Sequence, residues 1–312
     1  MQRKRNRKNR NRTLHIGLMA VLLSAAYTTG STSTGWAASS SNNAASSLTS
    51  FGQAGTRTAD DRETESHHRH TELHNHAHEE GQKQTASVQW SFVPEQPKAG
   101  EPATIQLAVV DANGQPVQSF SLNHEKEIHL IAVSSDLSEF SHLHPVDEGA
   151  GQFSVDTVFP KGGKYKLFAD FIPAGGSHQV AQTEVAVSGK TTAAGPLVPD
   201  KQLVQMVDGT QVTLQTNRLQ AGKETALTFT FKDANTGRPV QDMEPYLGAA
   251  GHVVIISEDL SQYLHVHPEE GQTAGPKAAF KTEFPSPGLY KIWGQFQRHG
   301  DTFITSFTVK VG

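Results

Sequence analysis

From about residue 86 onward, the chain consists of short runs of apolar and β-branched residues separated by turn sequences. Apolar and polar side chains alternate in residues 165–171, which predicts a strand with one buried face. Its apolar face is Tyr165, Leu167, Ala169 and Phe171, and its polar face includes Lys166 and Asp170. About seven such strands per hundred residues, without helical periodicity, are typical of an immunoglobulin-like β-sandwich. We therefore expect an all-β fold.

The same pattern occurs twice along the chain. Residues 290–296 repeat the strand 165–171, and the Phe-Pro turn that begins at residue 159 returns at residue 284. Matching positions lie 122 to 125 residues apart, so the repeat spans a whole domain. The sequence predicts two tandem immunoglobulin-like β-sandwich domains, at residues 86–188 and 198–312, joined by a linker at 189–197.

Each predicted domain contains one copy of a histidine motif. The first copy is His129, His142 and His144, and the second, 123 residues later, is His252, His265 and His267. Alternate residues of a strand share a face, so a His-x-His pair presents two imidazoles on one side of a sheet. Imidazole is the commonest metal ligand, and a third histidine at a fixed distance completes a three-nitrogen site.

The expected geometry depends on the register of a hairpin. If Ser135 and Asp136 form its tip, His129 lies opposite His142, and the same arithmetic places His252 opposite His265. Three imidazoles would then cluster on one sheet face in each domain. A shift of one residue in the register would move these side chains to the other face. The alternative to a metal site is that the histidines are core residues bonded to backbone carbonyls.

The N-terminal region has a different composition. A basic segment is followed by an apolar stretch at 14–27 and small residues up to Ala37, which is the layout of a secretory signal peptide over 1–37. An uncleaved anchor is the alternative. Residues 38–85 are polar and are expected to be a disordered linker. This linker contains six histidines, which are either weak metal ligands or solvated side chains: His67, His68, His70, His74, His76 and His78.

Charge and cysteine content exclude several classes of function. The net charge is -4, with 27 Lys and Arg against 31 Asp and Glu, and the basic residues cluster only at the N-terminus. We therefore expect no nucleic-acid partner. The chain has no cysteine, which excludes disulfides, thiolate zinc sites and blue-copper centres.

The two halves resemble a group of bacterial exported tandem β-sandwich proteins. The matching segments are HEKEIHLIAVSSDLSEFSHLHP with FPKGGKYKLFADFIPAGG in the first half, and GHVVIISEDLSQYLHVHP with PGLYKIWGQFQR in the second. In architecture this group is similar to the small periplasmic copper carriers, which are histidine-using β-sandwiches. The resemblance implies a secreted or envelope protein that handles metal.

The sequence thus predicts an exported, non-catalytic metal-binding protein for sequestration or delivery. Nitrogen-rich sites bind Cu(II) most tightly in the divalent series, so Cu(II) is expected ahead of Zn. A membrane or envelope metal-handling protein is the expected partner. The alternative is a cell-surface or secreted interaction module with structural histidines. A minor alternative is an enzyme like copper–zinc superoxide dismutase, which Leu264-His-Val-His267 resembles, although the disulfide of that family has no counterpart here.

Three further histidines carry less weight. His124 has Leu247 as its counterpart in the second repeat, so we expect it to serve the first domain only. His178 and His299 follow matching strands at unequal spacings and are expected on the surface.

Overall fold

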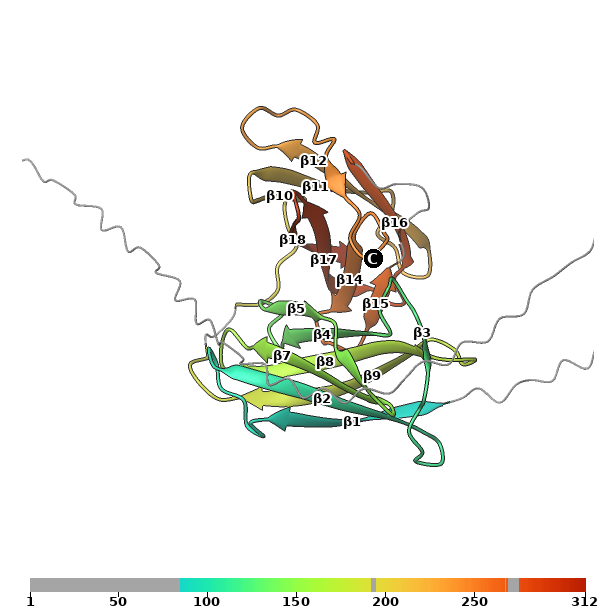
Figure 1. The fold of residues 1–312 in the computed structure, drawn as a ribbon. Helices are drawn as coiled ribbons and strands as arrows, with labels where there is room; N and C mark the ends of the chain where they lie inside the picture. The colour runs from blue at the N-terminus through green and yellow to red at the C-terminus, as the bar shows by residue number, and fades with distance from the viewer. Residues whose placement is uncertain (1–84, 192–194, 267, 269–274) are drawn as a thin grey trace, which may run out of the picture. The chain divides into compact units, whose positions relative to one another are not determined.

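The computed structural model describes residues 85–191, 195–266, 268 and 275–312 (Figure 1). These residues form eighteen β-strands and no α-helix, so the expected all-β fold of two tandem immunoglobulin-like sandwiches is confirmed. Among them is no helix long and apolar enough to cross a membrane. The expected signal peptide and all of the expected linker except Thr85 lie outside the described residues.

Sandwich 1, residues 85–191, consists of two antiparallel sheets. One sheet has the strand order β1 (Ala86–Val93), β2 (Pro102–Asp111), β7 (Gln152–Val158) and β6 (Val146–Gly149). The other has the order β3 (Phe120–Ser121), β8 (Gly163–Pro173), β4 (Ile128–Ser134) and β5 (Phe140–Leu143), with β9 (Gln179–Val187) also paired to β8.

Sandwich 2, residues 195–312, repeats this arrangement, and both sandwiches belong to one compact unit of the chain. Its first sheet has the order β10 (Val204–Val207), β11 (Thr210–Thr216), β12 (Glu224–Asp233) and β16 (Lys277–Glu283). Its second has the order β13 (Met243–Glu244), β17 (Gly288–Arg298), β14 (His252–Ser257) and β15 (Tyr263–Val266), with β18 (Asp301–Val311) also paired to β17.

Each sandwich has its own hydrophobic core between its two sheets. In β8 the four alternate residues expected to face inward are all buried in the core of sandwich 1, namely Tyr165, Leu167, Ala169 and Phe171. Tyr290, Ile292 and Phe296 of β17 occupy the core of sandwich 2. The alternation read from the sequence is therefore confirmed in both repeats.

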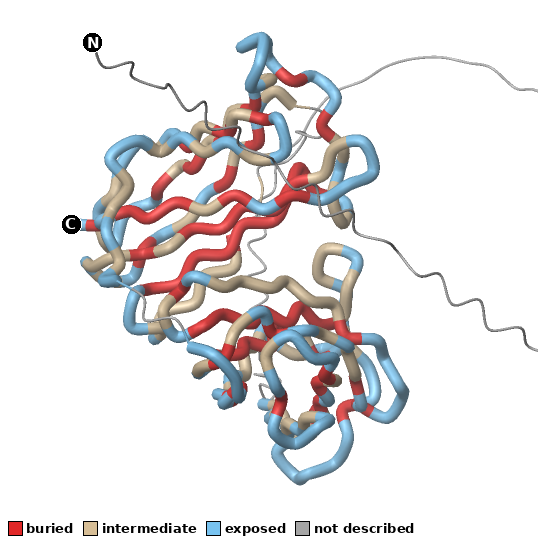
Figure 2. The backbone as a smooth tube through the Cα atoms, turned by 90° about the vertical axis from the view of Figure 1, so that its left-hand side faces the viewer, coloured by how far each residue is buried: buried red, intermediate tan, exposed pale blue. Residues whose placement is uncertain are grey.

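Two strands are buried on both faces. All seven residues of β4 and all six of β14 are buried, which is the class of residue that Figure 2 colours red. One sandwich core can cover only one face, so the other face must be covered separately. The outer faces of these two sheets contribute to one further apolar cluster, which we call the junction: Ile131, Val133, Leu137, Phe168, Val254, Ile256 and Trp293. The sequence pattern did not predict this contact between the repeats.

The junction contacts are reciprocal. Phe140 stacks on Trp293 with ring centroids 4.8 Å apart, and Phe168 stacks on Tyr263 at 4.9 Å. Phe140 is the repeat equivalent of Tyr263, and Phe168 is the equivalent of Trp293. Each sandwich therefore supplies the same two positions, and the contact has the approximate two-fold symmetry of an isologous dimer interface.

We expect Trp293→Ala to destabilise the protein by about 3 to 5 kcal/mol, because it removes a buried ring and leaves a cavity against Phe140. Urea denaturation measures the change. Val146→Ala, at a position 63% exposed, is the control and should change the free energy of unfolding by less than about 0.5 kcal/mol. A Trp293→Ala variant as stable as the control would mean that the junction contributes little.

Candidate metal centre

The hairpin register differs from the expected one. Ile131 pairs with His142 and Leu130 with Leu143, so the expected pairing of His129 with His142 is wrong by two residues. The Asp136 carboxylate accepts a hydrogen bond from the Ser138 N–H at 3.1 Å, which moves the turn one position along the chain. A shift of two residues keeps every side chain on its expected face.

Sandwich 2 makes the same correction. Val254 pairs with His265, so the expected pairing of His252 with His265 is also wrong by two residues. Gly251 precedes His252 with a φ of 149°, and a Cβ at Gly251 would lie 2.8 Å from the Gln295 carbonyl oxygen. This close approach brings the start of β14, and with it His252, directly against β17.

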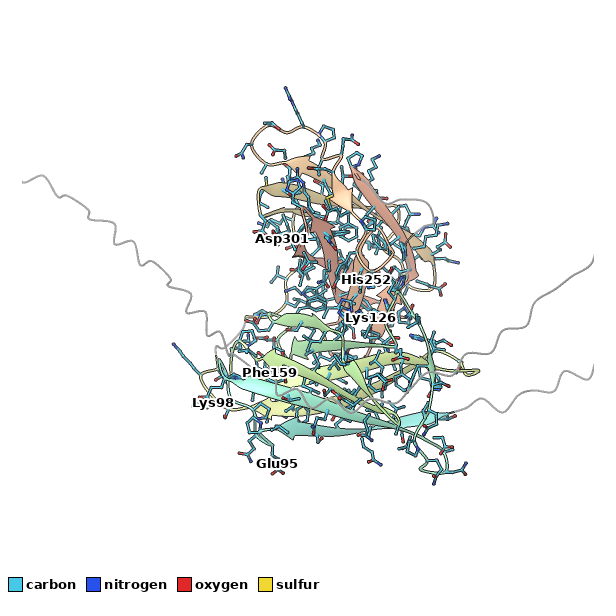
Figure 3. All side chains as sticks on the ribbon, viewed as in Figure 1. Glu95, Lys98, Lys126, Phe159, His252 and Asp301 are labelled. Atoms are coloured by element: carbon cyan, nitrogen blue, oxygen red, sulfur yellow. The ribbon has the colours of Figure 1, made fainter. Side chains whose placement is uncertain are left out.

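The histidines of both repeats lie on the outer faces of their sheets. Leu130 and Leu143 point into the core of sandwich 1, so the residues between them in the alternation point outward. His129 is 0% exposed and His252, labelled in Figure 3, is 2% exposed. They are buried because the other sandwich covers them at the junction.

Six imidazoles form one cluster there, which we call the histidine cluster: His124, His129, His142, His144, His252 and His265. Ring centroids are 4.6 Å apart for His142 and His144, and 5.4 Å apart for His129 and His252. The spacing of the motifs predicts a separate cluster in each domain. The structure instead brings the described histidines of the two motifs together.

The remaining histidines have different outcomes. His267 and the six linker histidines lie outside the described residues. His124 contacts both repeats, with its centroid 6.4 Å from that of His129 and 4.7 Å from that of His252. Its expected restriction to the first domain is therefore wrong: its repeat counterpart is Leu247, and the sequence carried no signal of the contact between repeats. His178 and His299 are 45% and 66% exposed, as expected for surface residues.

Hydrogen bonds fix the tautomers of two cluster members. His129 Nε2 lies 2.7 Å from the Asn123 carbonyl oxygen, which can only accept, so the neutral ring carries its proton on Nε2 and its lone pair on Nδ1. His142 Nδ1 lies 2.9 Å from Gln295 Oε1, and with the amide oxygen on this side the ring donates from Nδ1 and has its lone pair on Nε2. Those two lone-pair nitrogens, His129 Nδ1 and His142 Nε2, face each other at 2.9 Å.

Two facing lone pairs repel unless a proton or a cation lies between them. Nitrogens bound to one ion at about 2.05 Å are about 2.9 Å apart when they subtend 90°. His144 belongs to the same group, because ligand atoms of His129, His142 and His144 all lie within 4.8 Å of one another. His144 Nε2 is buried without a hydrogen-bond partner. These three side chains have the spacing and the chemistry of a nitrogen metal site.

Burial keeps these rings neutral. Burial, helped by neighbouring histidines, lowers the pKa of His129 and of His144 to about 4. Burial also holds the pKa of His142 and of His252 well below the usual value. Neutral imidazole is the form that binds a metal, so no proton needs to be removed at neutral pH.

A buried carboxylate orients the next ring. Asp170, on the outer face of β8, accepts hydrogen bonds from His265 Nδ1 at 2.8 Å, His178 Nε2 at 2.6 Å and the Tyr263 hydroxyl at 3.2 Å. Burial raises the pKa of Asp170, but the bonds from His178 and His265 outweigh it and hold that pKa below its usual range. The bond to Asp170 leaves the lone pair of neutral His265 on Nε2. A carboxylate behind a histidine is the usual outer partner of a metal ligand.

Asp170 and Gln295 are repeat equivalents, since Asp170 is five residues after Tyr165 and Gln295 five after Tyr290. Each accepts a hydrogen bond from a histidine of the other sandwich. Neither residue was singled out as functional from the sequence. The available signal was their place on the polar face of a strand whose other face is core.

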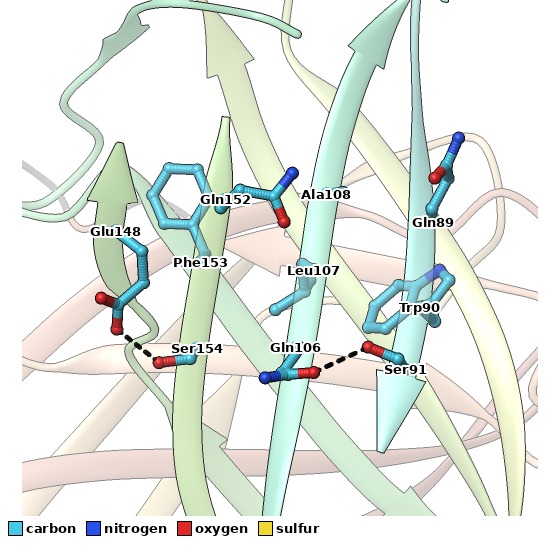
Figure 4. Close-up of a pocket in the computed structure, with 10 residues that line it drawn as sticks. All are labelled: Gln89, Trp90, Ser91, Gln106, Leu107, Ala108, Glu148, Gln152, Phe153 and Ser154. Atoms are coloured by element: carbon cyan, nitrogen blue, oxygen red, sulfur yellow. Dashed lines mark hydrogen bonds between the residues drawn. The ribbon is translucent and has the colours of Figure 1, made fainter. Parts of the chain in front are cut away.

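A separate hollow of about 600 Å³ lies on the sheet of β1, β2 and β7 (Figure 4). Its polar side chains hydrogen-bond to one another: Ser91 donates to Gln106 at 3.0 Å, and Ser154 donates to Glu148 at 2.7 Å. No histidine lines it. The chemistry therefore concentrates at the junction and not in this hollow.

No curated protein sequence matches the chain. Similar solved structures include the Escherichia coli adhesin FdeC, with a TM-score of 0.24 and 18% identity over 74% of this chain and 65% of that chain. InvD of Yersinia pseudotuberculosis has a TM-score of 0.22 and 14% identity over 72% and 57%. Titin Ig tandem domains A164-A165 have a TM-score of 0.20 and 12% identity over 73% and 97%. The chain spans less than two thirds of the FdeC and InvD chains, and the likeness concerns the fold class only.

One family model matches the chain twice. It is described as Domain of unknown function (DUF8832), and it matches residues 83–189 and residues 205–312. The two matches confirm the tandem repeat inferred from the sequence. The chain therefore belongs to the DUF8832 family, as two tandem copies of that domain.

Proposed function

We propose that this protein is a non-catalytic binder of a divalent transition metal, which it holds with His129, His142 and His144 at the junction of its two sandwiches. The observation that carries the proposal is the pair of lone-pair nitrogens, His129 Nδ1 and His142 Nε2, that face each other at 2.9 Å. A protein interior rarely leaves such a pair uncompensated, and a bound cation turns the repulsion into two coordinate bonds.

The donor set favours copper. All ligands are neutral imidazole nitrogens, and Cu(II) binds such sites more tightly than Zn(II) does. The resemblance to periplasmic copper carriers agrees with a role in sequestration or delivery, with an envelope metal-handling protein as the partner. The basic and apolar N-terminal segment supports export to the cell exterior, either as a cleaved signal peptide or as an anchor.

The alternative function is a surface interaction module in which the histidines are structural. The fold class agrees with this alternative, because adhesin and titin segments share it. The fold class by itself carries no observation for metal binding. The hydrogen bonding of the cluster distinguishes structural histidines from metal ligands. The ring nitrogens of structural histidines have hydrogen-bond partners, whereas His144 Nε2 and both ring nitrogens of His252 are buried without partners.

Replacement of one ligand tests the proposal. We expect His142→Ala to weaken Cu(II) binding by more than about 100-fold, because it removes a coordinate bond. Titration against a competing chelator measures the affinity. His299→Ala is the matched control, since His299 is 66% exposed and bonded to Asp242 outside the cluster, and it should leave the affinity unchanged. Equal affinities for the two variants would favour structural histidines.

The buried carboxylate of Asp170 gives a second test. Asp170→Asn keeps the size of the side chain but removes a buried negative charge that acts on His129, so we expect Cu(II) affinity to fall about 10-fold. The same chelator competition measures it. Gln295→Asn, at the equivalent position, shortens the neutral acceptor of His142 and gives the matched comparison. A metal affinity independent of Asp170 would remove it from the site.

Acid should destabilise the metal-free protein. The pKa of His129 and of His144 is about 4 in the folded chain against an ordinary value of 6.5, so the unfolded chain takes up protons first. The free energy of unfolding has its full value above pH 6.5. It decreases as the pH falls from 6.5 toward 4, by up to about 1.4 kcal/mol per pH unit for each histidine. Urea denaturation of metal-free protein at pH 7.5, 6 and 5 checks this prediction. A free energy of unfolding that stays flat across this range would contradict neutral buried histidines.

A further inference from the structure

The histidine cluster contains more donors than one ion takes. Copper and zinc sites in proteins are filled by about four ligands, commonly three histidines and one exchangeable ligand. The cluster has six described imidazoles. His129, His142 and His144 suffice for the ion proposed above, so the other three rings have no role in that site.

The six rings supply two groups of three, which meet where His129 lies 5.4 Å from His252 and 5.3 Å from His265 between ring centroids. Imidazoles that share one ion at about 2.05 Å have ring centroids about 4.5 Å apart at 90° and about 5.5 Å apart at 120°. In the first group the centroids of His129, His142 and His144 are 5.1, 5.2 and 4.6 Å apart. In the second, His124 lies 4.7 Å from His252 and 5.6 Å from His265, and the last two are 6.0 Å apart. The distances from His124 match the range for one ion, whereas the His252–His265 distance lies about 0.5 Å beyond it.

An independent observation points to a ligand at the second group. His252 is 2% exposed, and neither of its ring nitrogens has a hydrogen-bond partner. A neutral imidazole buried in this way loses the hydrogen bonds that water would give it, and no hydrogen bond among the described residues replaces them. Its neighbour His265 is bonded to Asp170 through Nδ1, so Nε2 is the nitrogen that it would offer to a metal. A cation bound here would satisfy the His252 ring.

We propose that His124, His252 and His265 bind a second divalent transition-metal ion beside the first. This inference rests on the proposed function and extends it from one ion to a pair. The two groups are adjacent, because the His129 and His252 centroids are 5.4 Å apart. Asp170, fully buried and bonded to His265, supplies the negative charge that offsets part of the second ion's charge.

The chain itself suggests the variant that tests the proposal. Leu247 is the repeat equivalent of His124, and the two have nearly equal φ values of 50° and 47°. His124→Leu therefore places in the first repeat a residue that the same loop already accepts in the second. His124→Asn is the second variant, because Asn tolerates positive φ if Leu impairs folding.

Copper content per chain is the measurement. Each variant is made in the full-length chain with the six linker histidines replaced by alanine, because that tract can hold ions of its own. The protein is titrated with CuCl₂, loosely bound metal is removed by gel filtration, and copper and the integrated EPR signal are measured. We expect two ions per parent chain, with an EPR signal smaller than the total copper because neighbouring Cu(II) ions couple. His124→Leu and His124→Asn should hold one ion with a full EPR signal, and His299→Ala should hold two.

Two outcomes would overturn the inference in different ways. If the parent chain holds one ion, His142→Ala loses it and His124→Leu keeps it, there is a single site and the second ion does not exist. If the parent chain holds no copper, the proposed function fails as well. Metal-free unfolding curves of the variants that match the parent chain show that a lost ion reflects a lost ligand.

Discussion

The structure depends on the contact between the outer faces of its two five-stranded sheets. Each buried apolar side chain of the junction contributes about 1.5–3 kcal/mol, and seven of them lie there. Each buried polar atom without a partner costs about 1–3 kcal/mol. The apolar contacts therefore hold the two sheets together, and the imidazoles beside them stay buried and neutral. Histidines exposed on a single sheet would not have this environment.

Much of this arrangement is visible in the sequence. Alternation in 165–171 identified the core face of β8, and the offset of 123 identified the two histidine motifs. The predicted register was wrong by two residues, yet the histidines lie on the expected face because the side-chain period of a strand is two. The face on which a side chain lies can therefore be inferred more safely than its cross-strand partner. A turn can shift the pairing by two residues, whereas the alternation of buried residues still determines the face.

The rest could not be predicted because it arises between the repeats. Ile131 and Val254 meet through contacts that no local pattern encodes, although the unbroken apolar runs in β4 and β14 are the signal of strands covered on both faces. The roles of Asp170 and Gln295 follow from the same contact, since each bonds a histidine of the other sandwich. The junction is nearly symmetric in its apolar residues and differs mainly where the cluster needs charge or an extra ring, at Asp170 and His124.

The two halves of the histidine cluster are joined by one polypeptide, with β9 ending at Val187 and β10 beginning at Val204. Two separate chains with the same faces would assemble the cluster only at concentrations near their dissociation constant. Here the connection fixes the effective concentration of one face around the other, which short linkers set in the millimolar range. Metal affinity then becomes a property of the single molecule, unchanged when the protein is diluted into a large volume.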